Sequence, residues 1–96
     1  MGIEFVELRP VDGRKSFYGK AVAMYHEPTN TWMLKSYDTI VCSYRLESEL
    51  FTRLWDGYSS TTMRHINSFL VFMGHKPKGK AWWTSLPMFS GELVED

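Results

Sequence analysis

The sequence predicts an α+β protein in which an antiparallel meander of four or five strands carries one main helix on one face and a short C-terminal helical turn. Three observations support this prediction. Much of residues 3–55 alternates in polarity with the period of a strand, whereas residues 61–73 repeat their apolar positions with the period of a helix. Turn signals rich in Gly, Pro, Asn and Asp separate the segments, and a chain of 96 residues allows one domain, residues 1–96.

The first two strands are predicted over residues 3–8 and 16–25, on either side of an Asp-Gly turn signal. In the second segment one face carries several small residues, among them Ala21 and Ala23. Small side chains on that face allow a helix or another backbone to approach closely. A turn follows at residues 27–30, where proline pre-sets the φ angle that the turn requires.

The next strands are predicted over residues 31–35 and 38–46, joined by a bulge or a bend at residues 36–38. Strict alternation in the second of these segments places Val41 on the face opposite to that of Ile40, Cys42, Tyr44 and Leu46. Residues 50–55 alternate again, and an Asp-Gly pair ends them. The spacing of these segments predicts hairpin connections between neighbouring strands.

The main helix is predicted over residues 61–73, with Ser59 or Ser60 as its cap and Gly74 as its end. At helical spacing, one broad apolar arc contains Met63, Ile66, Phe69, Leu70 and Met73. The opposite side of the helix contains Arg64, Asn67 and Ser68. Residues 80–86 are predicted to form one or two further helical turns before a proline.

The composition favours an interaction surface. Hydrophobic residues form 44% of the chain and aromatic residues 16%, made up of four Trp, five Tyr and six Phe. These side chains exceed what one small core easily buries, so some are expected on the surface, where aromatic residues suit binding. Eleven basic residues balance eleven acidic ones, so the chain as a whole has no field that attracts nucleic acid.

The cellular setting is expected to be the cytoplasm. Cys42 is the single cysteine, so no intramolecular disulfide is possible. No apolar stretch approaches the roughly 20 residues that span a bilayer, and the N-terminus lacks the pattern of a signal peptide. We therefore expect a protein that does not interact with membranes.

A run of hydroxyl side chains at residues 58–62 precedes His65 and permits three interpretations. Thr61 or Thr62 with His65 resembles a nucleophile and its base, but no spacing supplies the third group that would orient the base. Capping of the helix is the favoured interpretation. The third is an anion site for a phosphate or carboxylate at the helix N-terminus. We expect no enzyme and no catalytic residue.

No metal or cofactor site is expected either. The three histidines, His26, His65 and His75, lack the spacing of known metal-binding motifs. Cys42 lies in the middle of a predicted strand, which is typical of a small buried apolar residue.

A short basic segment precedes two adjacent tryptophans. Lys76, Lys78 and Lys80 lie close to Trp82 and Trp83, and such a combination can follow a phosphate backbone while stacking bases. A solvated loop is the simpler interpretation of the three lysines. Of two adjacent tryptophans on a helical turn, one usually faces the core.

Four phrases of the sequence, in this order, resemble small uncharacterised proteins that are encoded by bacteriophages and mobile elements, often of Gram-positive hosts. They are residues 14–21, 36–41, 54–70 and 79–82. The resemblance covers most of the chain between residues 14 and 87, and the segment from Tyr58 to Asn67 is its most specific part. It implies a phage setting, and because no activity is assigned to these proteins it implies no catalytic residue.

From these observations we expect a non-enzymatic phage protein that binds and blocks a host defence protein, for instance a CRISPR effector. The expected contact residues are Tyr37, Arg64, Trp82 and Trp83. The alternative is a module that binds nucleic acid or a nucleotide through Ser60, Thr61, Arg64, Lys76, Lys78 and Lys80. A homodimer formed through a sheet edge or an aromatic patch is a further possibility.

Overall fold

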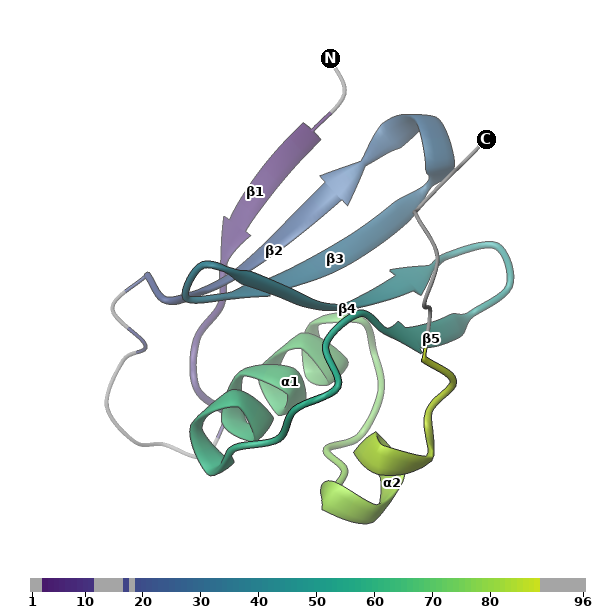
Figure 1. Ribbon diagram of the computed structural model, residues 1–96. Coiled ribbons are helices and arrows are strands. Elements are labelled where there is room, and N and C mark those ends of the chain that lie inside the picture. The colour runs from purple at the N-terminus through teal and green to yellow at the C-terminus, as the bar shows by residue number, and fades with distance from the viewer. Residues whose placement is uncertain (1–2, 12–16, 18, 89–96) are drawn as a thin grey trace.

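The computed structural model describes residues 3–11, 17 and 19–88, which form five strands followed by two α-helices (Figure 1). In chain order the elements are β1 (Ile3–Glu7), β2 (Ala21–His26), a 3-10 turn (Glu27–Thr29), β3 (Thr31–Ser36), β4 (Thr39–Arg45), β5 (Leu50–Arg53), α1 (Ser60–Phe72) and α2 (Lys80–Ser85). The strands form one sheet in the order β1-β2-β3-β4-β5, and each neighbouring pair is antiparallel. The predicted α+β fold with its main helix and short second helix is therefore confirmed.

Strand β2 is shorter than predicted, because a turn precedes it. The strand begins at Ala21 rather than at residue 16. Gly19 has a φ of 77°, and the backbone N–H of Lys20 donates a hydrogen bond to the carbonyl of Phe17 (3.0 Å). Glycine adopts this left-handed conformation without the steric cost that a side chain would add. Residues 16 and 18 lie outside the described residues.

Strand β4 contains a β-bulge that simple alternation does not predict. Leu34 of β3 pairs with Cys42 and Lys35 pairs with Ile40, so Val41 is an extra residue on the β4 side. Val41 and Cys42 are each 1% exposed, which means that two consecutive side chains enter the core. The predicted alternation is therefore wrong at Val41.

Both helices lie on the same face of the sheet, the lower face in Figure 1, and no described element covers the opposite face. Ala21 and Ala23 are completely buried, as expected for small residues on a packed face. The core joins side chains from the helix-facing side of the sheet to those of the helices: Leu8, Phe17, Ala21, Ala23, Leu34, Val41, Cys42, Tyr44, Phe51, Met63, Ile66, Phe69, Leu70 and Trp83.

Helix α1 begins and ends one residue earlier than predicted, at Ser60 and Phe72, and Ser59 and Gly74 have their predicted roles at its ends. The Ser59 hydroxyl oxygen accepts a hydrogen bond from the backbone N–H of Thr62 (3.0 Å), which caps the N-terminus. At the C-terminus Gly74 has a φ of 89° and His75 N–H donates to the carbonyl of Leu70 (2.8 Å), as in a Schellman motif. No helix among residues 3–88 that the structure describes is long and apolar enough to span a membrane.

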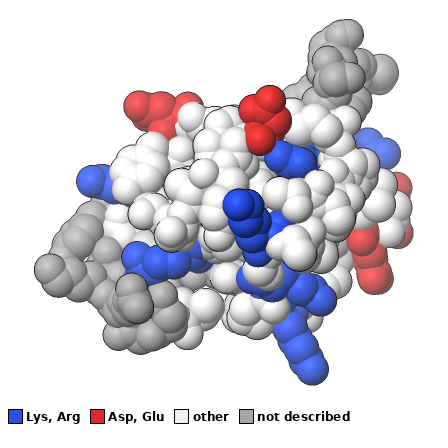
Figure 2. Space-filling view, turned by 60° about the horizontal axis from the view of Figure 1, so that its bottom comes forward, with Lys and Arg blue, Asp and Glu red and all other residues white. Residues whose placement is uncertain are grey.

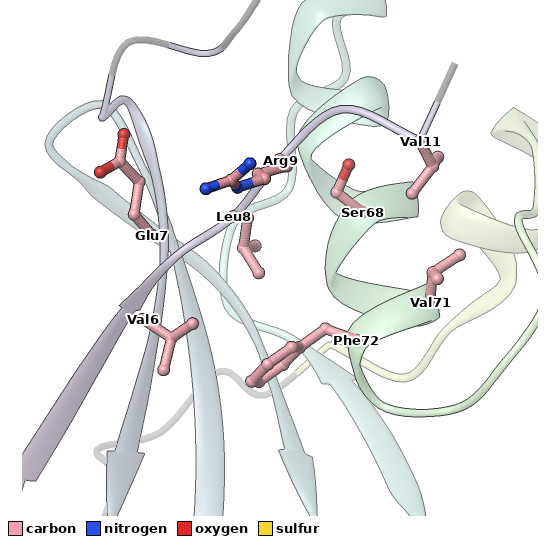
Figure 3. A pocket seen from close by; sticks show the side chains of 8 residues that line it. All are labelled: Val6, Glu7, Leu8, Arg9, Val11, Ser68, Val71 and Phe72. Carbon is pink, nitrogen blue, oxygen red and sulfur yellow. The ribbon is translucent and has the colours of Figure 1, made fainter. Parts of the chain in front are cut away.

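Two side chains of the helices are buried although they were expected to be accessible, Ser68 from helical spacing and Trp83 as a contact residue. Ser68 was expected on the outer side of α1 but is 3% exposed, because the chain that follows β1 passes over it (Figure 3). Trp83 of α2 is completely buried, and its indole Nε1–H donates to the carbonyl of Gly57 (2.8 Å). This bond satisfies the polar atom of a buried tryptophan and fixes α2 against the segment before α1.

The two faces of β3 provide a test of this packing. Leu34 is completely buried under the helices, whereas its neighbour Met33 points to the opposite, uncovered face and is only partly buried. We expect Leu34→Ala to lower the free energy of unfolding by about 2–5 kcal/mol, because it leaves a cavity in the core. Met33→Ala should cost clearly less, and urea denaturation of the two variants makes the comparison. Equal losses would contradict the assignment of the packed face.

Candidate functional site

The first candidate surface lies where the turn between β3 and β4 meets the N-terminal half of α1. We call it the tyrosine–arginine face and define it by Lys20, Tyr37 and Arg64, with Phe17 and His65 beneath them. The Nζ atom of Lys20 lies 5.5 Å from the centre of the Tyr37 ring, and the guanidinium of Arg64 lies 5.1 Å from the centre of the Phe17 ring. The two rings that hold these cations, Tyr37 and Phe17, both contact the ring of His65.

Tyr37 is held in an unusual backbone conformation. Its φ is 56°, in the left-handed region that tyrosine rarely adopts, and its side chain is 51% exposed. Its backbone N–H donates a hydrogen bond to the carbonyl of Lys20 (2.8 Å). This bond connects the turn to the segment before β2. An exposed aromatic side chain at a strained position is a pointer to function, since it contributes little to the core.

His65 supports this face from below. It is 2% exposed, its Nδ1 lies 2.7 Å from the Ser36 hydroxyl oxygen, and its ring contacts those of Phe17 (4.5 Å between centres) and Tyr37 (5.6 Å). Burial, and to a smaller extent the positive charge of Arg64, lowers the pKa of His65 below its usual value. The imidazole is therefore neutral at pH 7.

The hydroxyl groups that precede His65 serve the helix end. The Ser59 hydroxyl donates to the Thr62 hydroxyl oxygen (2.9 Å) and accepts from the Thr62 backbone N–H. The Nδ1 atom of His65 is engaged with Ser36 rather than with Thr61 or Thr62. The capping interpretation of these residues thus has direct geometric support, whereas the nucleophile–base pair has none among the described residues.

The predicted tryptophan contacts do not belong to the tyrosine–arginine face. The turn that carries Tyr37 lies at the left of Figure 1 and α2 lies at the lower right. Trp83 is buried in the core, so its assignment as a contact residue is wrong for the folded chain. Trp82 is partly buried and packs edge-on against Phe51, with 5.7 Å between ring centres. As expected for two adjacent tryptophans, one faces the core and the other remains partly accessible.

A second candidate surface joins the lysine segment to α1. The Nζ atom of Lys80 lies 5.1 Å from the centre of the Tyr58 ring, and the backbone N–H of Lys78 donates to the Asn67 side-chain oxygen (2.8 Å). Ser60, Thr61, Lys76, Lys78 and Lys80 are all exposed. Figure 2, a view from the side of the helices, shows basic side chains across the middle of this face and acidic ones at its margins.

A groove of about 270 Å³ separates β1 and the chain that follows it from the C-terminal half of α1 (Figure 3). Its lining is mostly apolar and consists of Val6, Glu7, Leu8, Arg9, Val11, Ser68, Val71 and Phe72. The Ser68 hydroxyl is buried and has no hydrogen-bond partner among the described residues. Sequence analysis missed this groove, although the apolar side chains of Val71 and Phe72, each 41% exposed, extend the pattern of α1 beyond its core-facing arc.

The remaining histidines and the cysteine have structural roles. The Nδ1 of His26 lies 2.8 Å from the Thr29 hydroxyl, and the Nε2 of His75 lies 3.0 Å from the Tyr44 hydroxyl. Burial raises the pKa of the Cys42 thiol well above its usual value, which leaves it protonated and unreactive. Within the described ranges, no three His, Cys, Asp or Glu side chains come together to hold a metal ion.

Sequence analysis found two anchors of the first surface, the exposed Tyr37 and the partly buried Arg64, but not the residues that hold them. Phe17, Lys20 and Ser36 were missed. All three lie within the phrases that carry the phage resemblance, at residues 14–21 and 36–41. The presence of these phrases together was the one feature of the sequence that could have indicated that these residues belong to the same surface.

Comparison with known proteins places the chain in a family without an assigned activity. A family model described as "Family of unknown function (DUF8033)" matches residues 6–85, and the chain belongs to this family. No curated protein and no solved structure matches the chain. The functional argument therefore depends on the surface of the molecule itself.

The buried histidine makes stability depend on pH. The folded protein binds a proton at His65 less readily than the unfolded chain does, because the pKa of His65 is lowered on folding. Stability should thus be highest above the unfolded pKa of about 6.5 and should fall as the pH decreases from there toward the lower folded pKa. Thermal unfolding of wild type and His65→Gln between pH 7.5 and 5 tests this. A slope that is the same in both proteins would contradict the assignment.

Proposed function

We propose that this member of a family of unknown function is a non-enzymatic protein, encoded by a phage or another mobile element, that binds a host component and blocks it. One observation carries the proposal. Tyr37 is an exposed aromatic residue in a left-handed backbone conformation with the cation Lys20 over its ring, and Arg64 lies over the ring of Phe17 on the same face. Such a conformation costs folding free energy, on the order of 1–3 kcal/mol, and residues held in it cluster at functional sites.

The geometry supports binding because the anchors are ordered in advance. The backbone bond from Tyr37 to Lys20 and the contact of the Tyr37 ring with His65 restrict the tyrosine, and the Phe17 ring supports Arg64. Tyrosine and arginine often supply most of the affinity of a protein interface. Residues that are restricted before binding lose less conformational freedom when the partner arrives.

The class of target follows from the phage resemblance rather than from the surface. Small phage proteins without a catalytic constellation often act by occupying a host surface, and a host defence protein such as a CRISPR effector is the expected target. Such a protein would act in the cytoplasm of the host cell. The first experiment is affinity capture from host lysate with and without nuclease, in which a stoichiometric protein that survives nuclease supports the proposal.

A second candidate function is the binding of nucleic acid or a nucleotide. It is favoured by the contact between Lys80 and Tyr58 and by the bond from Lys78 to Asn67, which bring the lysine segment alongside α1. Exposed lysines beside an aromatic ring are suited to phosphate and base contacts. Recovery of nucleic acid, or of proteins that are lost on nuclease treatment, would favour this function over the first.

Two exposed tyrosines provide a matched test of the first proposal. Each has a lysine over its ring, Lys20 over Tyr37 (5.5 Å) and Lys80 over Tyr58 (5.1 Å). Tyr37→Asn should leave the fold as stable as wild type or slightly more stable, because asparagine tolerates the left-handed conformation. It should nevertheless weaken binding to the captured host protein by about tenfold or more, as should Arg64→Ala.

The control for this test is Tyr58→Asn, which should not alter that affinity. Calorimetric titration measures the binding, and thermal unfolding measures the stability. If Tyr37→Asn and Arg64→Ala both bind the captured protein as wild type does, the tyrosine–arginine face is not the contact surface.

The second candidate function is tested by salt. If the lysine segment contacts phosphates, affinity for a fluorescent single-stranded oligonucleotide should fall steeply with salt concentration. Replacing Lys76, Lys78 and Lys80 by Ala should make the logarithmic slope shallower by about 2, because each phosphate contact contributes roughly 0.7 for single strands. Fluorescence anisotropy at several salt concentrations gives the slope, and a flat response of the wild-type protein would exclude this function.

A further inference from the structure

The two edges of the sheet differ in how they are covered. At the β5 edge the backbone N–H of Arg53 donates to the carbonyl of Pro87 (3.0 Å), and Arg53 forms a bridge with Met88. At the opposite edge, β1 pairs with β2 and with no other described strand. An uncovered edge presents backbone donors and acceptors to any strand that can align with it.

The hydrogen bonding of β1 identifies which backbone groups face outward. The backbone N–H of Leu8 donates to the carbonyl of Ala21 (2.9 Å), so the backbone of Leu8 points toward β2. Because direction alternates along a strand, Val6 also points toward β2, whereas Phe5 and Glu7 point to the free edge. This edge therefore offers the N–H and C=O groups of Phe5 and Glu7 to an added strand.

The groove between β1 and α1 lies beside this free edge (Figure 3). Val6 and Leu8 form its sheet side, and Val71 and Phe72 form its helix side. Its volume of about 270 Å³ and its mostly apolar lining leave room for an apolar side chain of a partner. A strand that pairs with β1 would direct every second side chain toward the side of the sheet that carries this groove.

The charge of β1 distinguishes between the strands that could occupy the edge. Glu7 and Phe5 (67% exposed) are exposed on the face of the sheet opposite to the groove, Glu4 is exposed on the groove side, and β1 contains no cation. Pairing of two copies of β1 about Phe5 would place each Glu7 opposite an Ile3, so this ribbon would contain four carboxylates and no cation to pair with them. A strand whose apolar side chains enter the groove and whose alternate residues are Lys or Arg would instead place a cation beside Glu7.

We propose that β1 accepts an extended segment of a partner protein as a sixth strand, in which an apolar side chain enters the groove and basic residues flank it. Recognition of this kind takes its affinity from backbone hydrogen bonds and its specificity from alternate side chains. The surface is separate from the tyrosine–arginine face, so it can fail or succeed independently of the proposed function.

The probe is a fluorescent synthetic peptide of about six residues that alternates valine and lysine, long enough for one strand. Its counterpart carries glutamate in place of every lysine. We expect the lysine peptide to bind at least about tenfold more tightly and to slow hydrogen exchange at the amides of Phe5 and Glu7. Equal binding of the two peptides, or no protection at these amides, would overturn the proposal.

Two variants test the geometry without threatening the fold. Phe5→Pro removes an N–H that faces the free edge, a position where an edge strand tolerates proline, and should weaken binding of the lysine peptide by about tenfold. Glu7→Lys changes only an exposed charge and should shift the preference toward the glutamate peptide. Tyr37→Asn should bind the lysine peptide as wild type does.

Unchanged binding in both Phe5→Pro and Glu7→Lys would overturn the assignment of the edge. Protection of the Phe5 and Glu7 amides that appears without peptide and grows with protein concentration would show that a second copy occupies β1. That result would replace the proposed partner by self-association.

Discussion

The hydrogen bond between the Ser36 hydroxyl and His65 Nδ1 fixes the helix to the sheet at the end of the molecule where the proposed contact surface lies. Both residues are buried, at 3% and 2% exposure, and a buried polar group without a partner would cost free energy. The bond therefore specifies one position of α1 relative to the end of β3. From this position follow the contact of Phe17 with His65, the support of Arg64 and the place of Tyr37 at the surface.

The features that local patterns encode could be predicted, and those that depend on distant contacts could not. The bounds of α1 follow from the period of its apolar residues and from the residues that cap the helix. Both depend on residues that are close to one another in the sequence. The bulge at Val41 and the burial of Ser68 depend instead on how β4 pairs with β3 and on where the chain after β1 runs. The same holds for the site. Tyr37 and Arg64 were identified by type, but their neighbours, and the burial of Trp83 against Gly57, follow from tertiary packing.

The two proposed surfaces use different physical means. On the tyrosine–arginine face, affinity would come from a few ordered side chains, and the backbone strain at Tyr37 is a cost carried by the free protein. At the β1 edge, affinity would come from backbone groups that every strand possesses, so selectivity must come from the groove and from the charge of Glu7. A small protein with both could hold a partner at a surface patch and at an extended segment together, which raises the effective concentration of the second contact.

The order of the strands also bears on how the chain folds. Each strand pairs with its neighbour in sequence, from β1 to β5, so every pairing closes a loop between consecutive strands. The docking of α1 and α2 and the contacts of residues 87 and 88 with β5 join more distant parts of the described chain. Because folding rates rise as contacts become more local, the hairpins are expected to form early, with helix docking as the later step that commits the chain to its native state.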